Sequence, residues 1–305
     1  MTQNGRAIFY LVLGIAVFSV QDLILKLLSG DYPLHQAMVA RSITAVPFML
    51  VLVYYFAGTL RTLISPAWPL MLLRGFLNFL AYTAYYMGLA ALPMATTVAL
   101  FFTAPLFITI LSVLILRETV ALPRWLGVFV GFVGVVLMMQ PEAGSFNAVA
   151  LLPIFCGLSY AGLMIMARVM GNRASGAAMA FWGNIAFLIC ALALSLMFGW
   201  NDSAPNASPS LAFLLRGWVW PTGYDLFLMC ACGAIAAFGL TLLTLAYTVG
   251  QSSIVTPFEF TFAFWGLLWG WLVWRELPNA LGWVGIALIV GAGIYVLRTK
   301  EKAAP

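Results

Sequence analysis

Long apolar segments alternate with short polar connections along almost the whole chain. A transmembrane helix needs about 20 mainly apolar residues to cross a hydrocarbon core of roughly 30 Å, and ten such segments follow one another. They cover residues 7–28, 36–57, 68–91, 95–116, 123–140, 149–170, 178–199, 225–248, 253–274 and 280–297. The alternating strands of an outer-membrane barrel are not seen. The pattern therefore predicts an all-α membrane protein with ten transmembrane helices.

Composition leaves no room for a soluble domain. Apolar residues make up 64% of the 305 residues and charged residues 8%, against about 45–50% and about 25% in a soluble domain, and the mean hydropathy is +1.04. The net charge of +5 is spread over many connections, which indicates membrane topology rather than nucleic-acid binding. The long connection is 200–224, where residues 211–220 form either a short interfacial helix or an irregular loop with aromatic anchors.

Basic residues predict the orientation, because loops rich in Lys and Arg stay in the cytoplasm. With a cytoplasmic N-terminus, the inner ends hold Arg6, Arg61, Arg117, Arg124, Arg168, Arg173, Arg298, Lys300 and Lys302. The outer connections then hold mainly Arg216 and Arg275, together with several acidic residues. Both termini are therefore predicted to lie in the cytoplasm (N-in, C-in).

The two halves of the chain repeat one another. One register superimposes an Arg-Glu pair, a tryptophan and a glycine: Arg117, Glu118, Trp125 and Gly127 fall on Arg275, Glu276, Trp283 and Gly285. Residues 1–145 and 146–305 each hold five spans, and because five is odd the second half enters the membrane from the opposite side. Two inverted five-helix repeats are typical of secondary transporters, which alternate access to a midplane site between the repeats.

Two segments carry the most distinctive pattern, MGLAALPMATTVALFFTAPLFITILSVLILRETV in the first half and TPFEFTFAFWGLLWGWLVWRE in the second. They resemble the EamA-type ten-helix exporters of the drug/metabolite transporter superfamily, and the glutamate near the end of each is similar to a marker of that family. The resemblance covers nearly the whole chain, although Ala263 stands where the first half has Pro105. Within the family the chain is most similar to bacterial exporters of aromatic amino acids, which implies a bacterial inner-membrane location.

Polar side chains within the spans are candidate functional groups, because a bilayer makes them costly. Helical spacing places Asn78 and Tyr82 on one face of the third span, and Glu259 lies beside the helix break expected at Pro257. Aromatic rings in other spans can stack on an apolar cargo. The candidate substrate-binding residues are Phe18, Gln21, Asn78, Tyr82, Phe101, Tyr160, Trp182 and Glu259.

Several polar groups also have a purely structural interpretation. Asp22 and Lys26 are four residues apart, which suits an intrahelical ion pair; with Glu259 they are equally candidates for coupling transport to protons. Arg41 and Arg74 lie near enough to span ends for their charges to reach the headgroups.

The fifth and tenth spans are rich in glycine and contain no ionisable side chain in 126–137 and 281–297. Small residues let helices approach closely, so we expect scaffold helices outside the transport path or a dimer contact, in a monomer or homodimer. His35, at the outer edge of the second span, is interpreted as a bystander.

An enzyme would need a nucleophile and base or a set of metal ligands. The chain has one histidine and no HExxH or GxSxG motif, so we expect no catalytic residue, no metal and no cofactor, and no nucleic-acid partner. A selectivity filter is not apparent either. The sequence therefore predicts a transporter, in contact with the lipid bilayer and a small-molecule substrate, that exports amino acids with aromatic ones favoured. S-adenosylmethionine, a nucleobase or a cationic drug is the alternative cargo, and proton-coupled and facilitated transport both stay open.

Overall fold

The computed structural model describes residues 3–28, 31–92, 94–139, 148–200, 209–274 and 279–298, and every regular element in them is helical. The long helices are α1 (Gln3–Leu28), α2 (Leu34–Ala57), α3 (Trp68–Ala91), α6 (Leu122–Met139), α7 (Leu151–Met170), α8 (Gly176–Phe198), α10 (Gly223–Val249) and α13 (Ala280–Arg298). Within these residues, six helical segments are long and apolar enough to cross a membrane, and α6 and α13 hold shorter apolar stretches. The all-helical prediction is confirmed. The boundary expected between the two repeats, near residue 145, lies outside the described residues.

Helix α3 is 24 residues long but is not among the six segments that are long and apolar enough to cross a membrane. It carries Arg74, Asn78 and several tyrosines, and such groups in a membrane helix normally face other helices or a cavity. The composition of α3 thus already marks it as an interior helix.

Two of the expected spans are interrupted. Span 95–116 consists of α4 (Met94–Phe101) and α5 (Ala104–Leu114), and span 253–274 consists of α11 (Ser252–Val255), the 3-10 helix η3 (Thr256–Phe260), α12 (Thr261–Trp269) and the π-helix η4 (Gly270–Trp274). Proline lacks an N–H group and its ring collides with the carbonyl four residues earlier. Pro105 therefore ends α4 near Phe101, and Pro257 separates α11 from η3 in the same way.

The interruptions in the two halves match in detail. The Thr103 hydroxyl donates to the carbonyl of Leu100 at 2.7 Å, and the Thr261 hydroxyl donates to the carbonyl of Phe258 at 2.7 Å. The register that places Arg117 on Arg275 also places Thr103 on Thr261. A side-chain hydroxyl thus satisfies a backbone carbonyl at the equivalent point of each broken helix.

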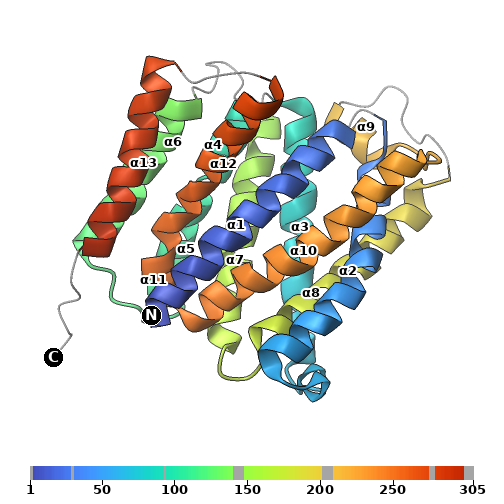
Figure 1. The fold of residues 1–305 in the computed structure, drawn as a ribbon, viewed down its shortest axis with the longest axis horizontal. Coiled ribbons are helices and arrows are strands. Elements are labelled where there is room, and N and C mark those ends of the chain that lie inside the picture. The colour runs from blue at the N-terminus through green and yellow to red at the C-terminus, as the bar shows by residue number, and fades with distance from the viewer. Residues whose placement is uncertain are drawn as a thin grey trace.

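The helices form one packed bundle (Figure 1). Helices α6 and α13 pack together at one side, α2 packs on α8 and α10 at the other, and α1, α3 and α7 lie between with the broken helices. Helix α1 begins and α13 ends on the same side of the bundle. Large apolar side chains such as Val51 and Tyr55 point outward, with exposed fractions of 68% and 77%, whereas Gln21 and Arg41 are buried. This inside-out distribution suits a protein surrounded by lipid.

Glycine permits the close crossing of α6 and α13. A methyl group added to Gly134 would lie 2.8 Å from the carbonyl oxygen of Gly285, which is closer than real side chains come. The two glycine-rich spans therefore pack on each other.

The long connection contains both structures that the sequence left open. Helix α9 (Pro209–Leu215) is followed by an irregular stretch, residues 216–222. The amide of Gln36 pairs with the backbone of Val219, donating to its carbonyl at 2.7 Å and accepting from its N–H at 3.1 Å. His35 is fully buried and contacts the Arg216 carbonyl at 3.1 Å through Nε2, so it anchors this connection to α2 and is not a bystander.

Candidate functional site

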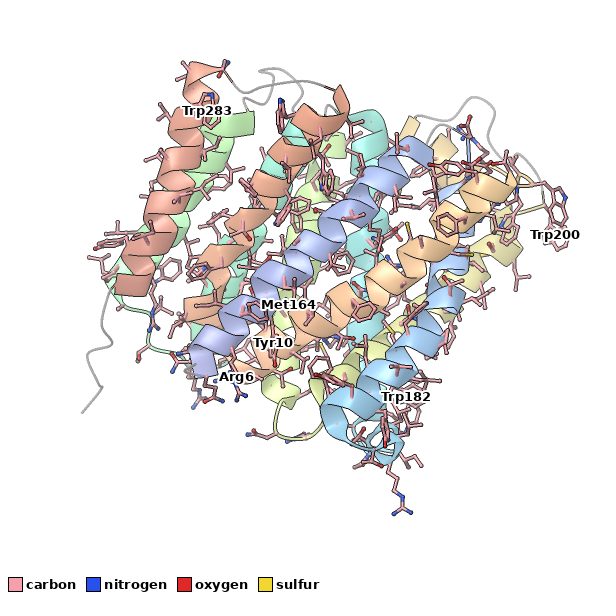
Figure 2. The ribbon with its side chains drawn as sticks, in the orientation of Figure 1. Arg6, Tyr10, Met164, Trp182, Trp200 and Trp283 are labelled. Carbon is pink, nitrogen blue, oxygen red and sulfur yellow. The ribbon has the colours of Figure 1, made fainter. Side chains whose placement is uncertain are left out.

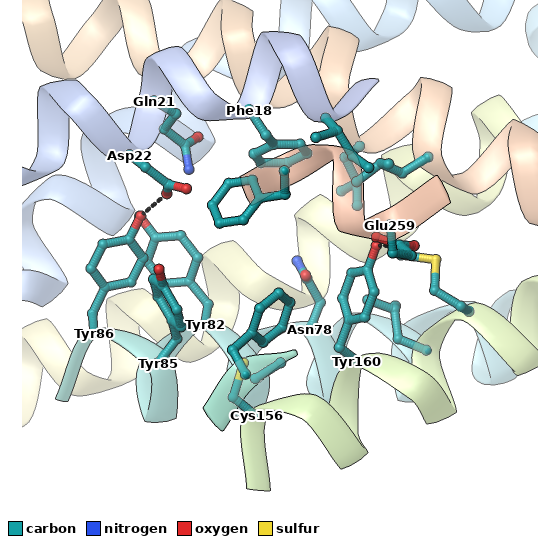
Figure 3. Close-up of a pocket in the computed structure, with 18 residues that line it drawn as sticks. Phe18, Gln21, Asp22, Asn78, Tyr82, Tyr85, Tyr86, Cys156, Tyr160 and Glu259 are labelled. Atoms are coloured by element: carbon teal, nitrogen blue, oxygen red, sulfur yellow. Dashed lines mark hydrogen bonds between the residues drawn. The ribbon is translucent and has the colours of Figure 1, made fainter. Parts of the chain in front are cut away.

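A cavity of about 140 Å³ lies between α1, α3, α4, α7, α10, η3 and α12. Figure 3 shows the 18 residues that line it. Its walls are mostly apolar and aromatic, and among these lining residues none is a lysine or arginine. The charged groups that do line it are the carboxylates of Asp22 and Glu259.

The structure brings together most of the residues singled out from the sequence. Seven of the eight candidate substrate-binding residues line the cavity: Phe18, Gln21, Asn78, Tyr82, Phe101, Tyr160 and Glu259. Asp22 lines it too. The side chain of Lys26 lies outside the described part of the structure, so its pairing with Asp22 stays a prediction.

Trp182 is not brought to this cavity. Its indole Nε1 donates to the Leu63 carbonyl at 2.9 Å, and its ring packs beside Met71 and Met179. Figure 2 shows it at an end of the bundle, near the connection between α2 and α3. This position is typical of a tryptophan that anchors a helix end at the membrane interface, and the predicted ligand contact of Trp182 is not seen at this cavity.

One end of the cavity is built around Glu259, which lies in η3 at the interruption of the ninth expected span. The hydroxyls of Tyr160 and Tyr247 both donate to its Oε1, at 3.0 and 2.7 Å. Within the described residues no hydrogen bond reaches the other carboxylate oxygen, Oε2. Phe101, the last residue of α4, occupies the equivalent position of the first half and also lines the cavity. The two helix breaks therefore place the carboxylate of Glu259 and the ring of Phe101 at the same cavity.

The other end is built around Asp22 on α1. Tyr86 on α3 donates its hydroxyl to Asp22 Oδ1 at 2.6 Å, and the ring of Tyr82 packs on the ring of Tyr86 with centroids 4.5 Å apart. The amide oxygen of Gln21 is buried here without a hydrogen-bond partner among the described residues. Figure 3 shows these four side chains grouped at the end of the cavity opposite Glu259.

Aromatic rings connect the two ends. Phe101 meets Tyr85 and Tyr160 edge to face, with ring centroids 5.6 and 5.7 Å apart, and Phe262 adds another ring beside Phe101. In Figure 3 the Asn78 amide points into the space between the two acidic ends. The arrangement can hold a planar ring between aromatic faces and place a positive charge next to either carboxylate.

The structure contradicts the expectation that Arg41 and Arg74 reach the headgroups, because both are buried. Arg74 donates to the Leu163 carbonyl at 3.1 Å, to the Met179 carbonyl at 3.5 Å and to the Thr244 hydroxyl at 2.7 Å, so it ties α3 to α7, α8 and α10. Arg41 lies between the rings of Tyr82 and Phe187, 4.7 and 4.6 Å from their centroids.

Sequence reasoning missed several lining residues. Tyr86 is four residues beyond Tyr82, so a further turn of the stripe from Asn78 would have included it. Other missed lining residues are Ile15, Ala81, Cys156, Leu163, Met164, Leu240, Leu243 and Phe262, whereas Tyr85 shares the helix face of Asn78 and Tyr82 in the sequence. Most of these are apolar, and an apolar side chain in an apolar helix carries no signal that separates cavity from lipid.

The chain is similar in sequence to known membrane transporters. Residues 5–140 match the sequence model of the EamA-like transporter family. The chain is 27% identical to an S-adenosylmethionine uptake transporter of Rickettsia prowazekii, with 98% of this chain and 94% of that protein covered. It is 28% identical to a riboflavin transporter of Vibrio cholerae, with 97% and 94% covered. It is also 28% identical to the pseudopaline exporter CntI of Pseudomonas aeruginosa, with 95% of each chain covered.

A solved crystal structure shares the fold, with a TM-score of 0.78 over 95% of this chain and 96% of that chain at 16% identity. The match to the family and the helical, lipid-facing structure agree with the resemblance seen in the sequence. Residues 5–140 of this multi-pass membrane protein are thus similar in sequence to the EamA-like transporter family, and the relatives that match nearly the whole chain are named as transporters.

Proposed function

We propose that the protein is a membrane transporter for a small cationic metabolite that carries a planar ring, of the S-adenosylmethionine class. The observation that carries this proposal is the pair of carboxylates, Asp22 and Glu259, in one aromatic-lined cavity with no basic residue among its lining residues. A cation at either end gains an opposite charge, and the rings between favour both a planar cargo and a positive charge over their faces. The relatives support this choice, since one of those described above is an S-adenosylmethionine uptake transporter.

Export of aromatic amino acids, expected from the sequence, receives less support. None of the relatives described above is named as an amino-acid exporter. An aromatic amino acid carries one ammonium group and one carboxylate, so it leaves the second cavity carboxylate without a counter-charge. A sulfonium metabolite with an amino-acid group has two positive centres, which matches two acidic ends.

The transport mechanism that we propose is alternating access between two inverted five-helix repeats in a bacterial inner membrane, with both termini in the cytoplasm. The matched interruptions at Thr103 and Thr261 support this arrangement, because broken helices that meet at a midplane site are typical of such transporters. Phe101 and Glu259, which flank these interruptions, contribute equivalent positions of the two halves to the same cavity.

Counterflow in proteoliposomes tests the proposal without an assumption about direction. Vesicles loaded with unlabelled S-adenosylmethionine are expected to take up labelled S-adenosylmethionine in a saturable manner, and empty vesicles are not. Asp22→Asn and Glu259→Gln are each expected to weaken exchange about tenfold, as loss of one close charge contact worth about 1.4 kcal/mol would. Asp31→Asn removes an exposed acid outside the cavity and serves as the matched control.

Competition by riboflavin, phenylalanine and a nucleotide sugar separates the alternatives. Exchange of phenylalanine without exchange of S-adenosylmethionine would refute the cationic-cargo proposal and restore the aromatic amino-acid interpretation. An unchanged rate in both Asp22→Asn and Glu259→Gln would show that neither carboxylate faces the cargo.

A further inference from the structure

Arg41 is a buried cation whose donors are not all used. Its side chain is 2% exposed, and its Nε and Nη1 have no hydrogen-bond partner among the described residues. Arg74, the other buried arginine described above, donates hydrogen bonds to two backbone carbonyls and a hydroxyl. Free donors on a buried guanidinium are costly and call for an explanation in the native state. Structural anchoring explains Arg74. The rings of Tyr82 and Phe187 stabilise the charge of Arg41, but they leave its Nε and Nη1 donors without an acceptor among the described residues.

The position of Arg41 connects it to the cavity. Its guanidinium lies 4.7 Å from the ring centroid of Tyr82, and Tyr82 itself lines the cavity. The Tyr82 hydroxyl has no hydrogen-bond partner in the described chain. Tyr82 thus contacts the guanidinium and also packs on the ring of Tyr86, which donates its hydroxyl to Asp22.

The Asp22 end also offers groups that accept hydrogen bonds. Asp22 Oδ1 accepts from Tyr86, and the Gln21 amide oxygen is buried and unpartnered. An ammonium group satisfies these acceptors, and a carboxylate on the same carbon satisfies the free donors of a guanidinium, which binds carboxylates well. The ligand complementary to all three side chains is therefore an α-amino acid group.

We propose that Arg41 binds the carboxylate of the cargo after Tyr82 changes rotamer, and that it makes the transporter selective for an intact α-amino acid group. This inference rests on the proposed cationic cargo, for which Asp22 and Gln21 take the ammonium group and Glu259 faces the second positive centre.

The experiment compares pairs of probes that differ by one carboxylate. S-adenosylmethionine and its decarboxylated derivative share the ring and the sulfonium, and phenylalanine and phenethylamine form a second pair. Each is used to inhibit counterflow, and the ratio of half-inhibiting concentrations within a pair is measured. Wild-type protein is expected to prefer the carboxylated member by about tenfold or more, the range of a charge-assisted contact.

Arg41→Gln is expected to bring this ratio close to one by weakening the carboxylated probe, while the decarboxylated probe still inhibits. Retained inhibition by the decarboxylated probe shows that the variant is folded. Arg41→Lys keeps the charge and is expected to keep part of the ratio, and Arg61→Gln, in the exposed connection before α3, is the control for the loss of one positive charge. If Arg41→Gln does not fold, the ratio of half-inhibiting concentrations in the wild type and in Arg41→Lys tests the role of Arg41.

The outcomes separate this inference from the proposed function. Exchange of S-adenosylmethionine with a ratio that is one in the wild type, or that does not depend on Arg41, overturns the role of Arg41 and leaves the cationic cargo standing. An Arg41-dependent ratio for the phenylalanine pair alone overturns the cationic cargo and keeps Arg41 as the carboxylate-binding residue. Absence of exchange for all four probes overturns both.

Discussion

At the scale of single residues, the two carboxylates of the cavity are held differently. Glu259 receives two tyrosine hydroxyls on one oxygen. Asp22 receives one. Hydrogen bonds to a buried carboxylate replace part of the hydration that it loses. The tyrosines therefore allow these acids to exist inside the membrane, before any cargo arrives.

The two tyrosines at Glu259 should have separable effects. Tyr247→Phe removes a hydrogen bond to a buried charged group, so the free energy of unfolding in detergent is expected to fall by about 1–3 kcal/mol. Because Tyr247 does not line the cavity, the apparent affinity for cargo should stay within about twofold, well under the tenfold that 1.4 kcal/mol represents. Tyr160→Phe, at a position that lines the cavity, should lower both the free energy of unfolding and the apparent affinity for cargo. Equal effects of the two substitutions on cargo affinity would contradict this division.

At the scale of elements, the lengths of the apolar segments predicted the uninterrupted helices well. The expected span 68–91 coincides with α3, and 280–297 differs from α13 by one residue at its end. The interrupted helices were predicted less completely. The sequence predicted the break at Pro257. It did not predict the break before Pro105, where α4 ends at Phe101 and α5 begins at Ala104.

The polar residues that line the cavity could be predicted from the sequence, whereas most of its apolar lining residues could not. Asp22 and Glu259 stand out in apolar helices, so the sequence identified them. Leu240 and Met164 line the same space, but their chemistry equals that of lipid-facing residues. Trp182 is equally conspicuous in the sequence, but it lies at a helix end, with its indole donating to the Leu63 carbonyl, and does not line the cavity.

The α6–α13 pair makes a prediction about packing alone. Gly134→Ala places a methyl group against the Gly285 carbonyl and is expected to lower the melting temperature in detergent, because backbone at this crossing cannot yield as a flexible side chain would. Gly291→Ala on α13 meets no atom within 4 Å and should be neutral or stabilising, since alanine favours a helix over glycine. Cargo preference should not change in either variant, and a lower melting temperature for Gly291→Ala instead would refute the argument.

At the scale of the whole molecule, one cluster joins the two halves at the end where α1 begins (Figure 1). The carboxylate oxygens of Glu118 accept the backbone N–H groups of Ser252 and Ser253, at 3.3 and 3.1 Å, at the start of α11. Arg124 donates to the Ser253 hydroxyl at 2.9 Å, and Arg168 lies 3.9 Å from Glu118. The cluster lies where the halves must separate if the cavity is to open on this side.

Glu118→Gln is expected to loosen this cluster, because an amide has one acceptor oxygen and no charge. Cys156, which lines the cavity, reports the opening in a background with Cys190, Cys230 and Cys232 replaced by alanine. A maleimide applied from the Glu118 side should label it about tenfold faster, as a loss of about 1.4 kcal/mol in closure predicts. Asp31→Asn, in the connection after α1 at the opposite end, is the control. Unchanged labelling would show that these bonds do not close the cavity.

The hydrogen bonds of Arg74 also bear on how the chain is made. Its partners belong to Leu163, Met179 and Thr244, which leave the ribosome long after α3 does. An arginine inside a transmembrane helix is costly unless it is paired, so the later helices supply the partners that make the buried position of Arg74 in α3 stable. The nascent first half is therefore an unfinished protein, and the second half completes its insertion as well as its transport path.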